Sequence, residues 1–301
     1  MQEKNIKDFD SYKKEYRKSV ENPEQFWEEK ANNFLWKKKW NKVLSWDFTK
    51  PDVKWFIGGQ LNITENCLDR HLEKRGSQIA IKWISNNTDE PNRDLSYSQL
   101  HKEVCKFSNV LKKNGAKKGD RICLYMPMVP ELAIAVLACA RIGAIHSVVF
   151  AGFSAKSLSD RINDANCNIL ITADGAFRGD KITPLKHISD EAMQNTPSID
   201  KCIVLKRINS DINIKQGRDV WWKDEMEKVD KNCTAETMDS EDPLFILYTS
   251  GSTGKPKGIV HSIAGYMIYT EYSFRNVFQY DEGDIYWCTA DIGWITGHSY
   301  I

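Results

Sequence analysis

Residues 121–150, RICLYMPMVPELAIAVLACARIGAIHSVVF, decide the fold class of this chain. They open with RICLYM, an apolar run of the length expected for a buried strand. A longer apolar segment then begins at Pro130 and stops before Gly143. Proline at the start and glycine just past the end are typical of a helix. AIHSVVF (144–150) is a second short apolar run. The stretch therefore predicts a strand–helix–strand unit whose two strands are parallel.

The sequence on both sides of this unit continues the same alternation. Residues 98–115 place apolar side chains on one helical face, namely Leu100, Val104, Phe107, Val110 and Leu111. The segments after the unit are a helix capped by Ser154, a strand at 167–174, a helix at 184–195, a strand at 201–207, polar residues 208–242 interpreted as a loop, and a strand at 243–248. We therefore predict an α/β fold in which a parallel sheet is flanked by helices on both faces.

The charge and hydropathy of the chain exclude several function classes. Its 42 Lys and Arg balance 41 Asp and Glu, whereas a duplex nucleic-acid binder would show a basic excess. The longest apolar run, residues 132–140, is too short to span a bilayer, and the charged N-terminus lacks a signal-peptide core. We therefore expect neither a nucleic-acid nor a membrane partner. The eight cysteines form no CxxC pair, which favours reduced thiols in a cytoplasmic protein over disulfides or a zinc site.

The first sixty residues differ from the rest because they hold five of the ten tryptophans. Their spacing is partly helical, since Phe26, Trp27, Phe34 and Leu35 could share one stripe. A helix with so much apolar surface must bury it. We therefore expect these aromatic side chains to clamp an N-terminal extension onto the main body.

A glycine- and hydroxyl-rich loop, YTSGSTGKPKG (248–258), follows the last predicted strand. It is not a P-loop, because only two residues separate Gly251 from Gly254 and because a proline follows Lys255. Its glycines still let backbone N–H groups approach oxygen atoms, and its hydroxyls and lysines can bind phosphate. A solvated turn between two strands is the alternative. Ligands of open α/β sheets bind at the carboxyl ends of strands, so the position of the loop favours phosphate binding.

Four long motifs carry a family resemblance. YTSGSTGKPKGIVHS (248–262) is similar to the phosphate-loop signature of the adenylate-forming superfamily. WFIGGQLNITENCLDRHL (55–72), IGAIHSVVFAGFSAKSLSDRI (142–162) and WCTADIGWITGHSY (287–300) resemble the acetyl-CoA synthetase family within that superfamily. The resemblance covers essentially the whole chain.

The resemblance also implies how the chain is organised. Residues 1–65 correspond to the N-terminal extension of the family and residues 66–301 to its AMP-binding domain. Members of the family are considerably longer, and this sequence stops at Ile301 inside a motif, which implies an N-terminal part without the lysine-bearing C-terminal domain. We expect such a part to be inactive by itself. We also expect residues 284–301 to enter a second, unfinished sheet and to leave four side chains unusually exposed: Trp287, Trp294, Tyr300 and Ile301.

The implied reaction activates acetate with ATP. The carboxylate attacks the α-phosphorus, pyrophosphate leaves, and the thiol of coenzyme A then displaces AMP from acetyl-AMP. Charge on the departing phosphates must be held, and Mg²⁺ would bridge their oxygens. The resemblance assigns catalysis to Lys257 and Thr253, and phosphate binding to Thr249, Ser250, Gly251, Ser252, Thr253, Gly254 and Lys257.

Two further sites follow from the resemblance, position by position. The implied residues are Trp294, Ile295 and Thr296 for the acyl pocket and the thiol approach, and Gly152, Arg178, Lys181 and Thr296 for coenzyme A. Without the family, Arg178 and Lys181 would be interpreted as a solvated charge cluster. Asp180 stands where the family usually has a glycine. Its carboxylate must therefore point away from a bound phosphate, or it would lower the affinity for that phosphate.

Other functions stay open at this stage. The acid could be propionate or another short acid, or the acyl group could be loaded onto a carrier protein, although the Arg178–Lys181 pair favours free coenzyme A. A truncated, non-catalytic nucleotide-binding module is the third alternative.

Among the histidines, His146 lies on a predicted buried strand and is interpreted as a hydrogen-bonded core residue, while His261 flanks the pocket. Neither has metal-ligand spacing to another His or Cys.

Overall fold

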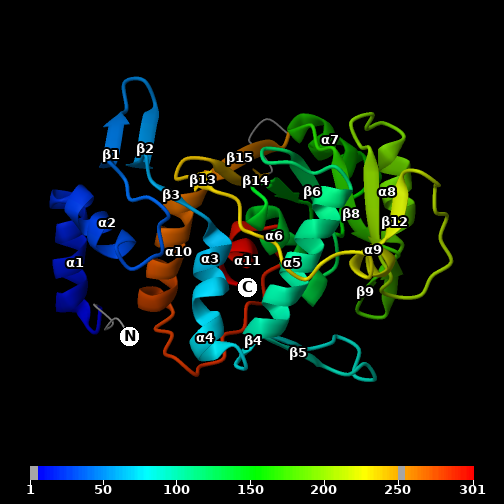
Figure 1. Cartoon of the computed structure of the whole chain (residues 1–301), viewed down its shortest axis with the longest axis horizontal. Helices are drawn as coiled ribbons and strands as arrows, with labels where there is room; N and C mark the ends of the chain where they lie inside the picture. The colour runs from blue at the N-terminus through cyan, green and yellow to red at the C-terminus, as the bar shows by residue number, and fades with distance from the viewer. Residues whose placement is uncertain (1–5, 250–254) are drawn as a thin grey trace.

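A computed structural model describes residues 6–249 and 255–301, which fold around a seven-stranded sheet (Figure 1). In spatial order the strands are β12 (Asp219–Trp221), β11 (Lys201–Leu205), β8 (Ile169–Ala173), β6 (Arg121–Tyr125), β7 (Ile145–Val148), β14 (Pro243–Thr249) and β15 (Lys257–Ser262). The first six strands are mutually parallel, and β15 pairs with β14 in the antiparallel sense. The predicted α/β class is confirmed. The antiparallel edge strand was not predicted, and it follows because the connection from β14 to β15 is too short for a crossover.

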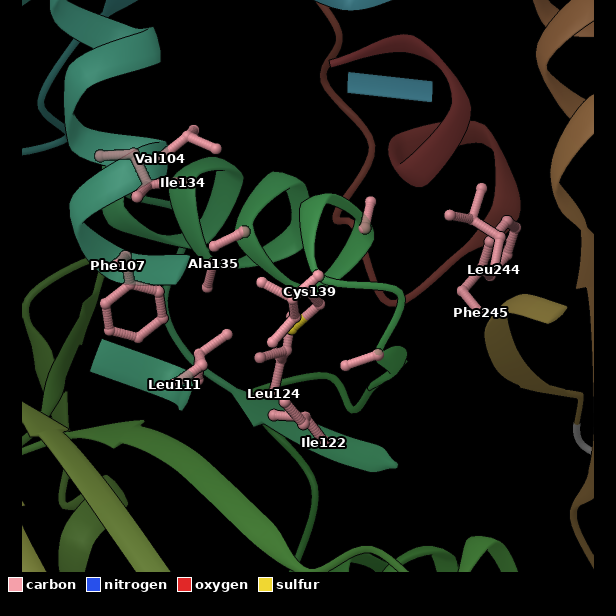
Figure 2. Packing of buried hydrophobic residues seen from close by; sticks show 14 of the residues in the cluster. Val104, Phe107, Leu111, Ile122, Leu124, Ile134, Ala135, Cys139, Leu244 and Phe245 are labelled. Atoms are coloured by element: carbon pink, nitrogen blue, oxygen red, sulfur yellow. The ribbon is translucent and has the colours of Figure 1, made fainter. Parts of the chain in front are cut away.

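Two pairs of helices cover the two faces of the sheet. The predicted helices are α5 (Tyr97–Lys113), α6 (Pro130–Arg141), α7 (Ala155–Ala165) and α8 (Leu185–Met193). Alternate residues of one strand join different cores: Ile122 and Leu124 of β6 pack with α5 and α6, while Cys123 packs with α7 and α8. This alternation is the two-residue period of a strand that is buried on both faces. Figure 2 shows the first core, with Val104, Phe107 and Leu111 of α5 facing Ile134, Ala135 and Cys139 of α6 and Ile122 and Leu124 of β6.

Local sequence signals explain where these helices begin and end. Ser96 caps α5 in a capping box with Gln99, and Ser154 caps α7 by accepting from the N–H of Ser157. Pro130 is the first residue of α6, as predicted. Gly143, just after α6, has a φ of +71°, a left-handed conformation that favours glycine.

The N-terminal region packs onto α10 (Ile263–Val277), beside which Figure 1 shows the first two helices. These helices are α1 (Phe9–Glu21) and α2 (Pro23–Ala31). The Phe26 and Trp27 rings lie 5.5 and 5.6 Å from the ring of Tyr272 on α10, so the predicted aromatic clamp is confirmed. The predicted stripe through Phe34 and Leu35 is wrong, because α2 ends at Ala31 and Leu35 is 50% exposed.

Short elements complete the fold. They are β1 (Lys42–Asp47), β2 (Asp52–Ile57), β3 (Gln60–Leu61), α3 (Ile63–Cys67), a 3₁₀ turn η1 (Asp69–His71), α4 (Leu72–Arg75), β4 (Ile79–Trp83), β5 (Arg93–Ser96), β9 (Ala176–Arg178), β10 (Lys181–Thr183), α9 (Trp222–Met226), β13 (Met238–Asp239) and α11 (Ile295–Tyr300). The loop prediction for residues 208–242 is therefore wrong in part, since β12, α9 and β13 lie there. Trp222 explains α9, because its ring stacks on Phe107 at 3.6 Å and is buried.

The C-terminal segment corrects another prediction. Residues 284–301, all of them described, contain no strand, and the expected second sheet is replaced by an irregular stretch and α11. Buried Gly297 allows this, because a Cβ there would lie 2.1 Å from the carbonyl oxygen of Asp291. The expected exposure is confirmed for Trp287 (83%), Trp294 (52%) and Ile301 (54%). Tyr300 is less exposed than expected, since it packs on Phe278 and its hydroxyl bonds the Ser273 hydroxyl at 2.7 Å.

Two global observations complete the description. Across residues 6–249 and 255–301, every helix is too short or too polar to cross a membrane. All eight cysteines are free.

Candidate active site

Three segments meet at the side chain of Phe150, just beyond the carboxyl end of β7. The Phe150 ring lies 5.0 Å from the ring of Trp294, which immediately precedes α11. The guanidinium carbon of Arg178, at the end of β9, lies 5.4 Å from the centroid of the same ring. Phe150 therefore joins a residue expected to bind coenzyme A to a residue expected to line the acyl pocket. Sequence analysis missed its role, although it lies two residues before Gly152 in the same motif (142–162).

Gly152 belongs to the same surface. A Cβ at this position would lie 2.4 Å from a Phe150 ring carbon and 3.0 Å from Nη1 of Arg178. No side chain fits there unless the aromatic ring moves, so the absence of a Cβ lets the backbone approach the ring and the guanidinium group.

Arg178 and Lys181 face each other across the β9–β10 hairpin. They are direct partners in the antiparallel register, and both are exposed. Like charges directly opposite are destabilising. Among the described residues neither cation forms a close ion pair, although the charge of Arg178 acts on the carboxylate of Asp291. The pair is therefore suited to bind an anion. Asp180 lies in the exposed turn of the hairpin. Among the described residues it forms no ion pair with Arg178 or Lys181.

Asp291 is a second residue that sequence analysis missed. Its Oδ1 accepts a hydrogen bond of 2.7 Å from the N–H of Gly293, which holds the turn before Trp294. Burial raises the pKa of Asp291, while the hydrogen bond and the charge of Arg178 oppose that rise. A Cβ at Gly293 would lie 3.1 Å from Cβ of Phe150, so this turn also contacts Phe150.

The residues expected to line the acyl pocket begin α11. Trp294 has the extended conformation of an N-cap residue, and Ile295 and Thr296 form the first turn. All three are exposed, with Ile295 at 45%. The described part of the chain brings Trp294 next to Phe150 but does not enclose these three side chains in a cavity. Two surface cavities of about 290 and 330 Å³ lie elsewhere, beside Trp222 and beside Trp36.

The expected phosphate loop connects the last two strands. Thr249 ends β14, Lys257 begins β15, and the two are paired in the ladder. Ser250, Gly251, Ser252, Thr253 and Gly254 lie outside the described residues. Tyr248 anchors the approach to the loop, because its hydroxyl donates to Oδ2 of Asp164 at 2.6 Å. β14 and β7 are parallel neighbours, so Thr249 at the end of β14 and Phe150 lie at the same edge of the sheet.

The histidine predictions have different outcomes. His146 is 1% exposed, and its Nε2 lies 2.7 Å from Nε2 of His298, so its interpretation as a hydrogen-bonded core residue is confirmed. His261, on β15, stacks on Phe245 with ring centroids 4.4 Å apart, and burial lowers its pKa. Its predicted position beside the ligand pocket stays a prediction. His298 was missed, because nothing in the spacing of the sequence pairs it with His146.

The fold is of the α/β class, and the ends of the glycine- and hydroxyl-rich segment lie on its last two strands. This chain belongs to the AMP-binding enzyme family, whose family model matches residues 68–301. Residues 12–67 match the acetyl-coenzyme A synthetase N-terminus, so the resemblance to acetyl-CoA synthetases is confirmed.

Curated relatives agree with this assignment. The chain is 52% identical over 291 residues to an acetyl-coenzyme A synthetase of Bdellovibrio bacteriovorus, with 96% of this chain and 45% of the relative covered. It is 53% identical to acetyl-coenzyme A synthetase 2 of Pseudomonas aeruginosa, with 97% and 45% covered. Among solved structures, acetoacetyl-CoA synthetase from Streptomyces lividans has a TM-score of 0.86 at 24% identity, with 94% of this chain and 43% of that chain covered. The chain thus spans less than half the length of the curated relatives it matches.

Proposed function

We propose that this chain forms the substrate-binding sheet edge of an AMP-forming acetate–CoA ligase. In the proposed reaction the acetate carboxylate attacks the α-phosphorus of ATP, pyrophosphate leaves, and the thiol of coenzyme A then displaces AMP from acetyl-AMP. The observation that supports this most is the contact of Phe150 with both Arg178 and Trp294. This contact supports the proposal because it brings Arg178, proposed to bind the nucleotide of coenzyme A, near the segment proposed to receive the acetyl group.

The proposed roles of the phosphate-loop residues follow from their chemistry. Thr249 offers a hydroxyl donor and Lys257 a compact positive charge at the two ends of the loop. Lys257 acts mainly as pyrophosphate departs and charge develops on the leaving group. Thr253 and its undescribed neighbours belong to this proposal on the family match alone. Mg²⁺ would be held chiefly by phosphate oxygens, and the described residues contain no cluster of three acidic, His or Cys ligands.

Coenzyme A is the proposed ligand of the Phe150 surface. Arg178 and Lys181 bind the 3′-phosphate, Gly152 lets the adenine approach the backbone, and Thr296 contacts the thiol end. Free coenzyme A fits this surface better than a carrier protein, because only the free form carries the 3′-phosphate that two facing cations can hold.

A second candidate differs only in the acid. Trp294, Ile295 and Thr296 are exposed, so the described residues do not limit the size of the acyl group. Propionate or another short acid therefore fits the same scheme. A non-catalytic nucleotide-binding module is a separate, third candidate. We also propose a cytoplasmic location, which eight free cysteines support. Separately, we propose that the chain divides into an N-terminal extension (1–65) and an AMP-binding domain (66–301).

Ligand discrimination tests the proposal on this chain directly. Coenzyme A and dephospho-coenzyme A are titrated calorimetrically against the wild-type protein and Arg178→Ala. We expect the wild type to prefer coenzyme A by about fivefold, as for a partly exposed ion pair of about 1 kcal/mol, and the variant to lose that preference. Arg17→Ala, which removes an exposed arginine from α1, is the matched control. Equal affinities of the wild type for both ligands would refute the proposed nucleotide site.

A further inference from the structure

A line of hydrogen bonds between side chains of three elements joins α11 to the centre of the sheet. Nε2 of His146 on β7 lies 2.7 Å from Nε2 of His298 on α11. Nδ1 of His298 lies 2.6 Å from the hydroxyl of Tyr266 on α10, and that hydroxyl donates to Oγ of Ser299 at 3.0 Å. Phe245 of β14 stacks on His298 with ring centroids 3.8 Å apart. We refer to His146, His298, Tyr266 and Ser299 as the His298 chain.

The direction of the hydrogen bonds in the His298 chain follows from its buried atoms. Burial lowers the pKa of His146 to about 3 and lowers that of His298 well below its ordinary value, so both rings are neutral near neutral pH. Two neutral rings joined through Nε2 require one donor and one acceptor.

Within the described residues, Nδ1 of His146 is buried without a hydrogen-bond partner. A buried N–H without a partner is less well tolerated than an unused acceptor, so His146 carries its proton on Nε2. His146 then donates to His298, His298 donates through Nδ1 to Tyr266, and Tyr266 donates to Ser299.

The His298 chain lies close to the contact between Phe150, which follows β7, and Trp294, which precedes α11. His146 lies four residues before Phe150, and His298 lies four residues after Trp294. The rings of Phe150 and Trp294 are themselves in contact at 5.0 Å. A helix of six residues has little stability of its own, so these contacts determine where its first turn lies.

We propose that His298 is a positioning residue, which holds the Trp294–Thr296 segment against Phe150 through its hydrogen bonds to His146 and Tyr266. The assignment of that segment to the acyl group rests on the proposed function. The position of the segment does not, because it depends only on contacts within this chain. An ordinary core histidine would contribute to stability but would not control the environment of Trp294.

Fluorine NMR of the 301-residue protein tests this with 5-fluorotryptophan, the Trp294 resonance being assigned from Trp294→Phe. His298→Phe keeps an aromatic ring against Phe245 but removes both hydrogen bonds, so we expect the Trp294 resonance to shift and broaden. Tyr266→Phe, which removes a single oxygen atom, should produce a smaller change of the same kind. His187→Phe is the matched control, because His187 is exposed on α8. A Trp294 resonance that is identical in the wild type, His298→Phe and Tyr266→Phe would overturn the proposal.

A conservative variant separates positioning from general core stability. In His146→Gln the amide N–H can occupy the place of the Nε2 proton, so we expect the Trp294 resonance to stay near its wild-type position. His146→Leu has no donor and should shift it. Equal shifts in both variants would overturn the proposal, since filling the core would then be all that His146 does.

Two further measurements complete the test. Histidine labelled with ¹⁵N should show His146 protonated on Nε2 and His298 on Nδ1, and an imidazolium at either residue near neutral pH would overturn the chain as described. Titration of the same samples with coenzyme A tests the proposed function separately. If the wild type does not distinguish coenzyme A from dephospho-coenzyme A, the nucleotide site fails, whereas the fluorine result needs no ligand and still decides the role of His298.

Discussion

At the scale of single residues, the candidate site depends on positions where a small change of shape has a large effect. Gly152 has room for a hydrogen atom but not for a methyl group, because the Phe150 ring and Arg178 occupy that space. Phe150 in turn touches Trp294, so a displaced ring would affect both proposed ligand positions. Packed surfaces transmit such shifts because they contain few voids.

Gly152→Ala should therefore weaken coenzyme A binding by about tenfold with little loss of fold, since the added methyl group displaces the Phe150 ring. Calorimetric titration and the thermal unfolding midpoint measure the two quantities. Gly265→Ala is the control, because a Cβ at Gly265 on α10 has no neighbouring atom within 4 Å. The control should keep its affinity for coenzyme A, and alanine in the first turn of α10 should stabilise it by less than about 1 kcal/mol. Unchanged binding in Gly152→Ala would contradict the close approach inferred at Phe150.

At the scale of elements, an ion pair ties the helices behind the sheet to the 3₁₀ turn η1. Arg141, at the end of α6, is 4% exposed and donates to both oxygens of Asp69, at 2.8 and 3.0 Å. Nε2 of His101 on α5 lies 3.4 Å from the same carboxylate. The bond to Asp69, with a smaller effect of Cys105, raises the pKa of His101 to about 9. Removing the partly exposed Asp69 would leave the buried charge of Arg141 without this partner, so the contact holds α5, α6 and η1 together.

The raised pKa of His101 predicts how stability depends on pH. The folded state binds this proton more tightly than the unfolded state, whose pKa is near 6.5. The contribution to the free energy of unfolding is therefore fully present below about pH 6.5 and is lost as the pH rises through about 9. Urea unfolding over this range should show a steeper alkaline decline for the wild type than for His101→Gln. His187→Gln, on the exposed face of α8, should behave like the wild type, and identical slopes in all three proteins would contradict the assignment.

At the scale of the whole molecule, the sheet ends in an edge strand that carries apolar side chains. On β15, Ile259 is 45% exposed and Val260 is 57% exposed, and no described strand pairs with its outer side. Trp287 is 83% exposed. An apolar strand edge of this kind is a template for pairing with another chain, so the isolated protein should associate with itself.

Val260→Lys should slow this association severalfold, because a charged side chain at a strand edge opposes edge-to-edge pairing. Light scattering during incubation measures the rate of association. The free energy of unfolding, measured by thermal unfolding, should change by less than about 0.5 kcal/mol because the position is exposed. Val277→Lys is the control, since Val277 is 72% exposed but lies on the helix α10. An equal effect of both substitutions would show that total surface hydropathy, and not the edge of β15, drives association.

The sequence by itself determined the α/β class, the four flanking helices and the order of the strands along the chain. Those features follow from the spacing of apolar residues and from residues that begin or end a helix, such as Pro130 and Gly143 around α6. Both signals act over a few residues. Where a strong local signal was missing, as at α9, the loop prediction failed, because stacking on Phe107 from a distant helix stabilises that turn.

Only the tertiary structure decided which side chains meet at the candidate site. Phe150, Asp291 and His298 lie within the quoted motifs, but nothing in those motifs assigned them a role. Their importance arises from contacts between distant segments, as in the 152-residue separation of His146 and His298. The C-terminal residues became a short helix although their apolar sequence favoured a strand. Their neighbours His146 and Tyr266 lie on β7 and α10, and a local pattern does not encode these contacts.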